Sequence, residues 1–202
     1  MLDTESTYCL AWQHAAATMG QELSASFCLS LSGLHHRDIE RKLIAWCGAD
    51  FNLQEFHHTA GLFWRDYVNT HGITIKRGFT TLLDTIIQQQ LPFCLATNSR
   101  AINAFECLDL AGLSGVFSTV ITREDVECGK PAPDIFIAAA ETLQVDIRHC
   151  MVLEDSYTGI VAATHAGAFS VYVPSVMPAD AAAIELCSMM VTDLSQVQAI
   201  II

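Results

Sequence analysis

Residues 152–159 read Val152-Leu153-Glu154-Asp155-Ser156-Tyr157-Thr158-Gly159, so an apolar run ends at two adjacent carboxylates. The run over 150–153 predicts a short buried strand, and a helix is expected to start at residue 156. Ligands of parallel α/β sheets bind beyond the carboxyl ends of the strands, where Glu154 and Asp155 fall. Two like charges side by side repel unless a cation compensates them, which favours Mg²⁺ held by hard oxygen ligands. The alternative is an acid pair that only stabilises the start of the helix.

A second strand end lies upstream, at Thr97-Asn98-Ser99. The apolar residues 91–96 predict a strand, and a helix is expected over 100–110. A hydroxyl and backbone N–H groups at such a strand-to-helix turn can hold phosphate oxygens. The alternative is that these three residues merely cap the helix.

A lysine lies between these two strand ends, in Gly129-Lys130-Pro131-Ala132-Pro133-Asp134. The flanking glycine and prolines favour a rigid turn over a helix face. Most lysines are solvated surface charges, but Lys130 in this turn can bind phosphate as a point charge and keep a neighbouring carboxylate ionised.

Apolar runs alternate with amphipathic helices from residue 79 onward. Further strands are expected over 116–121, 169–173 and 189–191, and further helices over 133–143 and from 156 to 167. This rhythm predicts an α/β fold with a doubly wound parallel sheet covered on both faces. One helix face is made by Phe79, Leu82, Leu83, Ile86 and Ile87. Upstream, residues 8–71 have apolar residues at helical spacing, which predicts an all-helical lobe.

Composition narrows the class of protein. The 202 residues are 51% hydrophobic, enough for one core and a smaller lobe. With 10 basic and 22 acidic residues, the chain lacks the basic clusters that hold nucleic acid. The eight cysteines form no C-x-x-C pair and are expected to be reduced core residues. The sequence shows neither a leader nor an apolar run of membrane-spanning length, so we expect a cytoplasmic protein.

Taken together, the three strand-end motifs resemble those of the haloacid dehalogenase superfamily of Mg²⁺-dependent phosphatases and mutases. Residues 95–99 resemble its second motif, 129–136 its third and 152–159 its fourth. The resemblance implies a core domain of residues 1–7 and 76–202, with a helical cap domain inserted over 8–75. It places the chain in the subgroup of β-phosphoglucomutase and small sugar-phosphate or nucleotide phosphatases.

The resemblance also implies a role for each motif residue. Thr97 and Asn98 would hold the transferring phosphoryl group, and Lys130 would neutralise it. Asp155 and Glu154 would hold Mg²⁺. Thr97, Lys130 and Asp155 are therefore the expected catalytic residues, acting by positioning and electrostatic stabilisation.

The family's first motif, a strand ending in two aspartates with the nucleophile, has no counterpart in this sequence. In the family this strand lies between the strand ending at Thr97 and the strand ending at Glu154. Its loss would leave buried N–H and C=O groups unpaired at roughly 1–3 kcal/mol each, against a net stability of about 5–15 kcal/mol. We therefore hypothesise a shortened form of a longer protein, and we expect the chain as written to have little or no phosphatase activity.

Substrate choice is expected to come from the cap, where His35, His36 and Arg37 lie in a segment that resembles the specificity loop of the mutase. The alternative is that these residues form an ordinary helix start. Three functions stay open: a phosphatase of small phosphomonoesters that forms an aspartyl-phosphate, a phosphomutase, and an inactive phospholigand-binding remnant. For the leading one we expect a monomer whose partner is a small phosphorylated metabolite, and neither nucleic acid nor a membrane.

Overall fold

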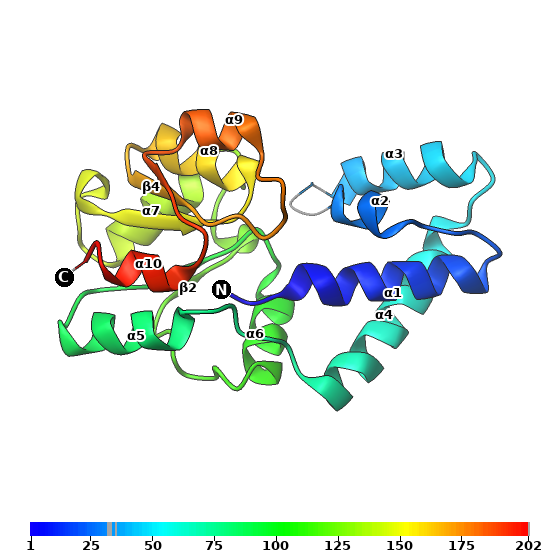
Figure 1. Cartoon of the computed structure of the whole chain (residues 1–202), viewed down its shortest axis with the longest axis horizontal. Helices are drawn as coiled ribbons and strands as arrows, with labels where there is room; N and C mark the ends of the chain where they lie inside the picture. Colours follow the sequence, from blue (N-terminus) through cyan, green and yellow to red (C-terminus); the bar gives the residue numbers. More distant parts are fainter. Residues whose placement is uncertain (32–33, 35, 202) are drawn as a thin grey trace. The chain divides into compact units, whose positions relative to one another are not determined.

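The computed structural model describes residues 1–31, 34 and 36–201. The chain divides into two compact units (Figure 1). One is Leu2–Thr74, and the other is Met1 together with Ile75–Ile202. Each unit has its own secondary structure.

The first unit is helical, as predicted. Its helices are α1 (Thr4–Thr18), α2 (Ala25–Leu29), α3 (His36–Cys47) and α4 (Leu53–His71). Helices α1 and α4 pack against each other through aromatic side chains: Tyr8 stacks on Trp64 with 5.2 Å between ring centroids. The Trp64 Nε1–H donates to Thr7 Oγ1 over 3.0 Å, so its polar group is satisfied inside the unit.

Side-chain caps set where these helices begin. The Asp3 carboxylate accepts a hydrogen bond from Ser6 N and opens α1, and the Asn52 side chain accepts one from Glu55 N and opens α4. Asp3 is therefore the N-cap residue of α1.

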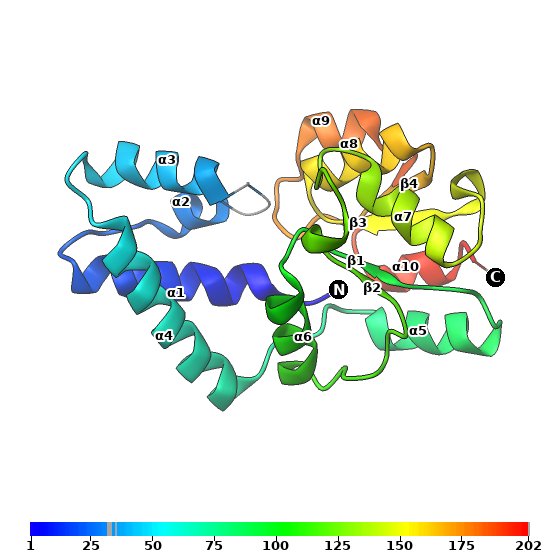
Figure 2. The same ribbon diagram turned by 180° about the vertical axis from the view of Figure 1, so that it is seen from behind.

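The second unit alternates strands and helices. Its strands are β1 (Leu95–Ala96), β2 (Val120–Ile121), β3 (Met151–Glu154), β4 (Phe169–Tyr172) and β5 (Met189–Met190). Its helices are α5 (Phe79–Gln88), α6 (Ala101–Leu110), α7 (Asp134–Thr142), α8 (Tyr157–Ala166), α9 (Ala181–Leu186) and α10 (Leu194–Gln198). Short 3-10 turns span Arg123–Asp125 and Ile147–His149. Helix α7 lies in front of the strands in Figure 2 and α10 in front of them in Figure 1, so helices cover both faces.

The described strands pair in parallel but form two separate sheets. One has the order β1-β2 and the other β3-β4-β5. Within the described residues, β1 and β3 are not paired with each other. Among the strands that the structure describes, β1 is paired with β2 only and β3 with β4 only. The family resemblance puts a further strand between β1 and β3.

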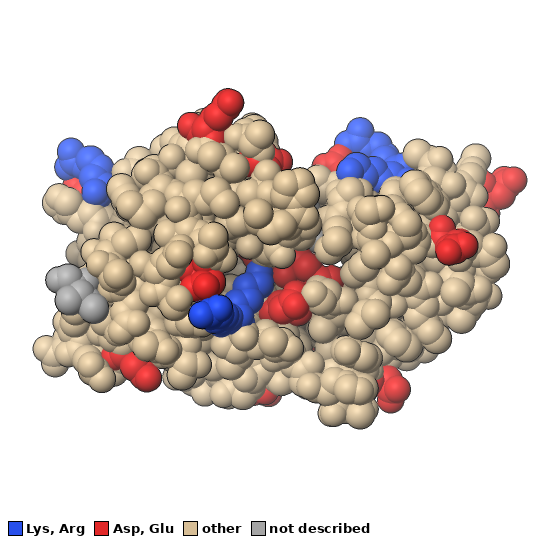
Figure 3. Space-filling view, in the orientation of Figure 1, with Lys and Arg blue, Asp and Glu red and all other residues tan. Residues whose placement is uncertain are grey.

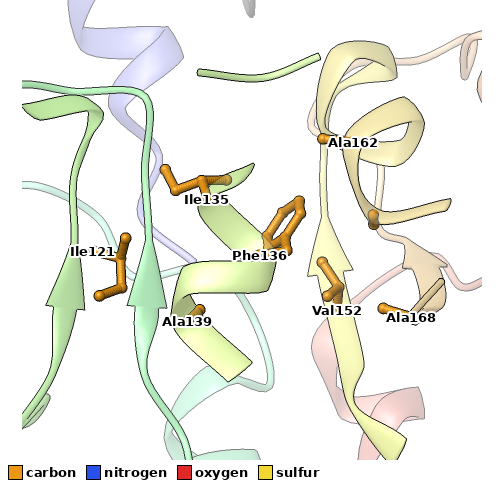
Figure 4. Packing of buried hydrophobic residues seen from close by; sticks show 8 residues of the cluster. Ile121, Ile135, Phe136, Ala139, Val152, Ala162 and Ala168 are labelled. Atoms are coloured by element: carbon orange, nitrogen blue, oxygen red, sulfur yellow. The ribbon is translucent and has the colours of Figure 1, made fainter. Parts of the chain in front are cut away.

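Helix α7 joins the two sheets through one hydrophobic cluster (Figure 4). Ile135, Phe136 and Ala139 of α7 pack with Ile121 of β2 and Val152 of β3. Ile135 is fully buried and Phe136 is 5% exposed. Because apolar burial provides most of the favourable free energy of folding, this helix holds together strands that share no backbone hydrogen bonds.

Strands β1 and β2 are shorter than the predicted 91–96 and 116–121. Their ladder consists of Leu95 paired with Val120 and Ala96 with Ile121. Leu91 is exposed, and the residues before Leu95 run beside no strand partner in the described chain. An apolar run predicts which residues are buried, but the length of a strand depends on how many of its residues pair with a neighbouring strand. In the described sheet, two residues of β1 pair with two residues of β2.

The eight cysteines are free thiols, and Cys9, Cys28 and Cys107 are buried. Burial raises the pKa of the Cys28 thiol to about 12 and that of Cys107 to about 11. In the part of the chain that the structure describes, no helix has the length and apolar character needed to cross a membrane.

Candidate active site

Thr97 follows β1 directly and continues its pairing, because its backbone N–H donates to Ile121 O over 2.9 Å. Its Oγ1 accepts a hydrogen bond of 3.1 Å from Ser99 N. This turn holds the threonine hydroxyl at the carboxyl end of the β1-β2 sheet. The hydroxyl still has its own hydrogen to donate to a ligand oxygen.

The start of α6 is stabilised by a different residue. Arg100 is the N-cap residue and makes no side-chain cap, whereas the Glu124 carboxylate accepts from Ala101 N over 2.9 Å. Thr97, Asn98 and Ser99 therefore do not cap this helix, so the alternative of a simple helix cap is wrong.

The turn around Lys130 is tied to the loop after β1. Lys130 N donates to Asn98 Oδ1 over 2.8 Å, and Asn98 Nδ2 donates to Lys130 O over 3.0 Å. A Cβ at position 129 would lie 2.6 Å from Asn98 Oδ1 and from the Arg123 side chain, so any residue larger than glycine would displace these side chains. These contacts tie the lysine backbone to the side chain of Asn98, the residue that follows Thr97.

The Lys130 side chain connects the ends of the two sheets. Its ammonium donates to Ala96 O at the end of β1 over 3.1 Å and forms a short ion pair with the Glu154 carboxylate at the end of β3. It also lies 4.8 Å from the centroid of the Phe136 ring. Both side chains of the ion pair are 9% exposed, so Lys130 is a largely buried cation and not a solvated surface charge.

Glu154 is held tightly at the start of α8. Its Oε2 accepts hydrogen bonds from Ser156 Oγ over 3.2 Å and from Asp155 N over 3.3 Å. A Cβ at Gly159 would overlap this carboxylate, so only glycine leaves room for it. Ser156 is the N-cap of α8 and accepts from Gly159 N over 3.1 Å. The acids themselves therefore do not cap the helix.

Asp155 has a different set of partners. Its Oδ2 accepts from Lys76 Nζ over 2.8 Å and from Ser175 Oγ over 2.6 Å. Burial by itself raises the pKa of this carboxyl, but the Lys76 charge and the hydrogen bonds from Lys76 and Ser175 outweigh it. The pKa of Asp155 is lowered from 3.8 to about 2, with a smaller contribution from the amino group of Met1. Asp155 is an anion at neutral pH.

Magnesium is the ion that the family resemblance implies, and the chemistry of the donors fits it. Glu154 and Asp155 are adjacent carboxylates at one strand end, and Asp155 stays ionised. Over residues 1–31, 34 and 36–201, no cluster of three or more Asp, Glu, His or Cys side chains could hold a metal ion. Each of the two carboxylates is instead neutralised by an ammonium, Lys130 on Glu154 and Lys76 on Asp155.

In the structure Lys130 thus contacts Asn98, Ala96 O and Glu154, and Thr97 and Asp155 directly follow Ala96 and Glu154 in the chain. Sequence reasoning missed two members of the site, Lys76 and Ser175. Ser175 lies just beyond β4, so the rule that ligands bind at the carboxyl ends of strands could have found it. Lys76 is 79 residues away from Asp155 in sequence, and no local pattern connects them.

The cap residues expected to set specificity lie in the helical unit. His35 is outside the described residues, and His36 begins α3. Arg37 is exposed on α3 and lines a shallow pocket with Glu40, Arg41, Ile44 and Leu53. A role of His35, His36 and Arg37 in substrate selection stays a prediction.

The haloacid dehalogenase-like hydrolase family model matches residues 13–167. The match includes Thr97, Lys130, Glu154 and Asp155, together with most of the helical unit. The chain therefore belongs to this family of hydrolases, as its strand-end motifs predicted.

Several characterised proteins are similar to the chain. The β-phosphoglucomutase of Bacillus subtilis is 28% identical over 185 residues, which cover 87% of this chain and 80% of that protein. The fructose-1-phosphate phosphatase of Escherichia coli is 27% identical over 169 residues, covering 83% and 87%. A bifunctional riboflavin kinase/FMN phosphatase of Arabidopsis thaliana is 38% identical over 86 residues, which cover 42% of this chain and 23% of that protein.

The fold is also found in solved structures. A HAD family hydrolase of Deinococcus radiodurans, crystallised with bound phosphate and sodium, superposes with a TM-score of 0.82 at 24% identity. The superposition covers 99% of this chain and 90% of that chain. The predicted α/β core with a helical lobe is therefore confirmed.

Proposed function

We propose that this protein hydrolyses a small phosphomonoester, such as a sugar phosphate or a nucleotide, at the rim formed by Thr97, Lys130, Glu154 and Asp155. The observation that carries the proposal is the position of the Lys130 ammonium. It contacts Ala96 O at the end of β1, one residue before Thr97, and also the Glu154 carboxylate at the end of β3. Cationic and hydroxyl groups are thereby gathered at one edge, where a phosphate ester needs them.

In this proposal each residue has a separate task. The Thr97 hydroxyl and the Asn98 backbone N–H bind the oxygens of the phosphoryl group and orient it. Lys130 neutralises the negative charge that spreads over these oxygens in the transition state. Glu154 and Asp155 would hold Mg²⁺, which supplies further charge neutralisation when bound.

The nucleophile in this proposal is a carboxylate that forms an aspartyl-phosphate. We place it on a strand between β1 and β3, the position that the described strands leave unpaired. Glu154 and Asp155 are poor candidates for in-line attack, because each carboxylate is neutralised by a lysine. The relatives support phosphate-ester chemistry, since their names include phosphatases and a phosphomutase.

The direct test joins a strand with two aspartates at its carboxyl end to residue 1 and measures phosphate release from a panel of sugar and nucleotide monophosphates, with and without Mg²⁺. We expect Mg²⁺-dependent release, abolished by Lys130→Ala and by Asp155→Ala. Lys42→Ala is the matched control, since Lys42 is an exposed lysine on α3 that donates to Ser30 O. Failure to release phosphate from every compound would refute the proposal. Turnover only with a bisphosphate present would indicate a phosphomutase.

We further propose a cytoplasmic monomer that acts on a small phosphorylated metabolite and binds neither nucleic acid nor a membrane. The formal net charge of −12 argues against binding to nucleic acid or to an anionic membrane surface, as does the face drawn in Figure 3, on which Lys and Arg form only small separate groups. Light scattering is expected to give the mass of one 22.1 kDa chain. A mass twice as large, independent of dilution, would contradict the monomer.

A further inference from the structure

We propose that Lys76 is a built-in competitor of the divalent cation at Asp155, so that its ammonium weakens metal binding and must leave the carboxylate when the metal binds. The inference rests on the proposed function, because it takes Asp155 as a metal ligand. It assigns a role to a residue outside the strand-end motifs.

The contacts of Lys76 put its charge on the oxygen that a metal would use. Lys76 Nζ lies 2.8 Å from Asp155 Oδ2, and Ser175 Oγ donates to the same oxygen over 2.6 Å. Lys76 and Ser175 also contact each other through a short hydrogen bond. The lysine backbone is anchored by a hydrogen bond of 2.8 Å from its N–H to Met1 O. Asp155 Oδ2 therefore already accepts two hydrogen bonds, one of them from a full positive charge.

A divalent ion at this carboxylate would have to displace the ammonium or remain close to it. Displacement breaks the ion pair, and coexistence places two cations within a few ångströms, where they repel strongly. In both cases the metal binds less tightly than it would without the ammonium. Replacing Lys76 with an uncharged residue should therefore strengthen metal binding, provided that the Asp155 carboxylate keeps its position.

The Lys76 ammonium can leave its carboxylate more easily than the Lys130 ammonium can. Lys130 contacts Glu154, Ala96 O and the Phe136 ring, and its side chain is 9% exposed. The Lys76 side chain is 19% exposed, and its Asp155 partner is 32% exposed. Lys76 can therefore move its head group into water on its long stem, whereas Lys130 is held inside.

The neighbouring residue provides a matched control. Arg77 is 84% exposed, and its charge faces Asp193 at 3.8 Å. Arg77→Met removes one positive charge next to Lys76 in sequence, but not from the Asp155 carboxylate. The two variants have the same net charge, so a difference between them reports on the Lys76–Asp155 contact.

The experiment titrates the full chain with Mn²⁺ as a paramagnetic probe at neutral pH and measures unbound Mn²⁺ by electron paramagnetic resonance. We expect Lys76→Met to bind Mn²⁺ about tenfold to a hundredfold more tightly than the unaltered chain. Lys76→Arg, which keeps the charge, should retain the weak affinity. Arg77→Met should change it by about twofold or less, because exposed charges are screened. Asp155→Asn should no longer bind Mn²⁺.

A second readout is thermal stability. Without metal, Lys76→Met should melt at a lower temperature than the unaltered chain, because Asp155 loses its counter-charge. Added Mn²⁺ should raise its melting temperature more than that of the unaltered chain, in line with tighter binding to the folded state. If Lys76→Met does not fold, Lys76→Gln replaces it, since the amide can still donate to Asp155.

The outcomes separate the inference from the proposed function. Equal or weaker Mn²⁺ binding by Lys76→Met, with binding lost in Asp155→Asn, would overturn the role of Lys76 and leave the metal site standing. Absence of Mn²⁺ binding in every variant, or unchanged binding in Asp155→Asn, would overturn both.

Discussion

The two sheets of the core differ in how much backbone pairing holds each of them. In the β1-β2 sheet two residues of each strand are paired, whereas β3 and β4 are paired over four residues and β5 extends their sheet. The polar groups at their ends differ as well, with a hydroxyl and an amide beyond β1 and two carboxylates beyond β3. The candidate site is therefore assembled from two sheets with unequal backbone pairing, which are joined by α7 and by the Lys130 side chain.

The largest effect is expected where α7 couples the sheets. Phe136→Ala should lower the free energy of unfolding by about 4 kcal/mol, since it empties a buried aromatic position. Amide hydrogen exchange should show that β1 and β2 lose more protection than β3 and β4. Val171→Ala, in a fully buried position on β4, is the control and should not produce this difference. Equal loss in both sheets would contradict the coupling, and Phe136→Leu serves if the alanine variant does not fold.

The next effect concerns the buried ion pair between the sheets. Lys130→Met should destabilise the protein by about 3 kcal/mol, because it leaves the Glu154 carboxylate buried without its counter-charge. In chemical denaturation the double variant Lys130→Met/Glu154→Leu should recover much of this loss. If the double variant is as unstable as the sum of both single variants, the pair does not link the sheets as described.

A smaller effect is expected at Asp155 and depends on pH. Its pKa is lowered from 3.8 to about 2, so folding favours the ionised carboxylate. This contribution is fully present above the pKa of the unfolded chain and is lost as pH falls toward 2. After allowance for partial exposure, it amounts to about 1–2 kcal/mol.

Urea unfolding at pH 5, 4 and 3 measures this contribution. Asp155→Asn should flatten the decline in stability over this interval relative to the unaltered chain. Lys76→Met should flatten it too, because the Lys76 charge lowers the pKa. A decline of the same steepness in both variants would assign the pH dependence to other carboxyl groups.

The smallest effect compares the two turns at the strand ends. Ser156→Ala should cost about 1 kcal/mol, since Ser156 caps α8. Thr97→Val should cost less, because the Thr97 hydroxyl accepts its hydrogen bond from Ser99 N in an exposed turn. Thermal denaturation of both variants measures this order, and a larger loss for Thr97→Val would mean that the β1 turn is the more rigid one.

Sequence patterns predicted the parts of this structure that depend on local chemistry. The helix over residues 79–88, the end of α8 at Gly167 and the strand before Glu154 follow from periodicity and end signals. Lys130 was found because glycine and proline flank it. The strand-end rule also placed Thr97 and the acid pair at the carboxyl ends of strands.

The remaining features depend on contacts between distant segments. The pairing of Asp155 with Lys76 joins residues 79 positions apart, and the bond between Asn98 and Lys130 joins residues 32 positions apart. The short extent of β1 is set by its partner β2 and not by its own apolar run. The family resemblance anticipated the separation of β1 from β3, whereas the ammonium groups that neutralise both acids could be seen only in three dimensions.

The two hydrogen bonds between the Asn98 amide and the Lys130 backbone link the loop after β1 to the lysine turn. A displacement of the loop after β1 therefore moves the lysine turn through its backbone, without a contact to the Lys130 ammonium. Exchange of the Asn98 amide for a carboxylate would remove the donor that faces Lys130 O and set two acceptors against each other. Such a change would disengage the lysine turn while every group that faces the ligand keeps its chemical identity.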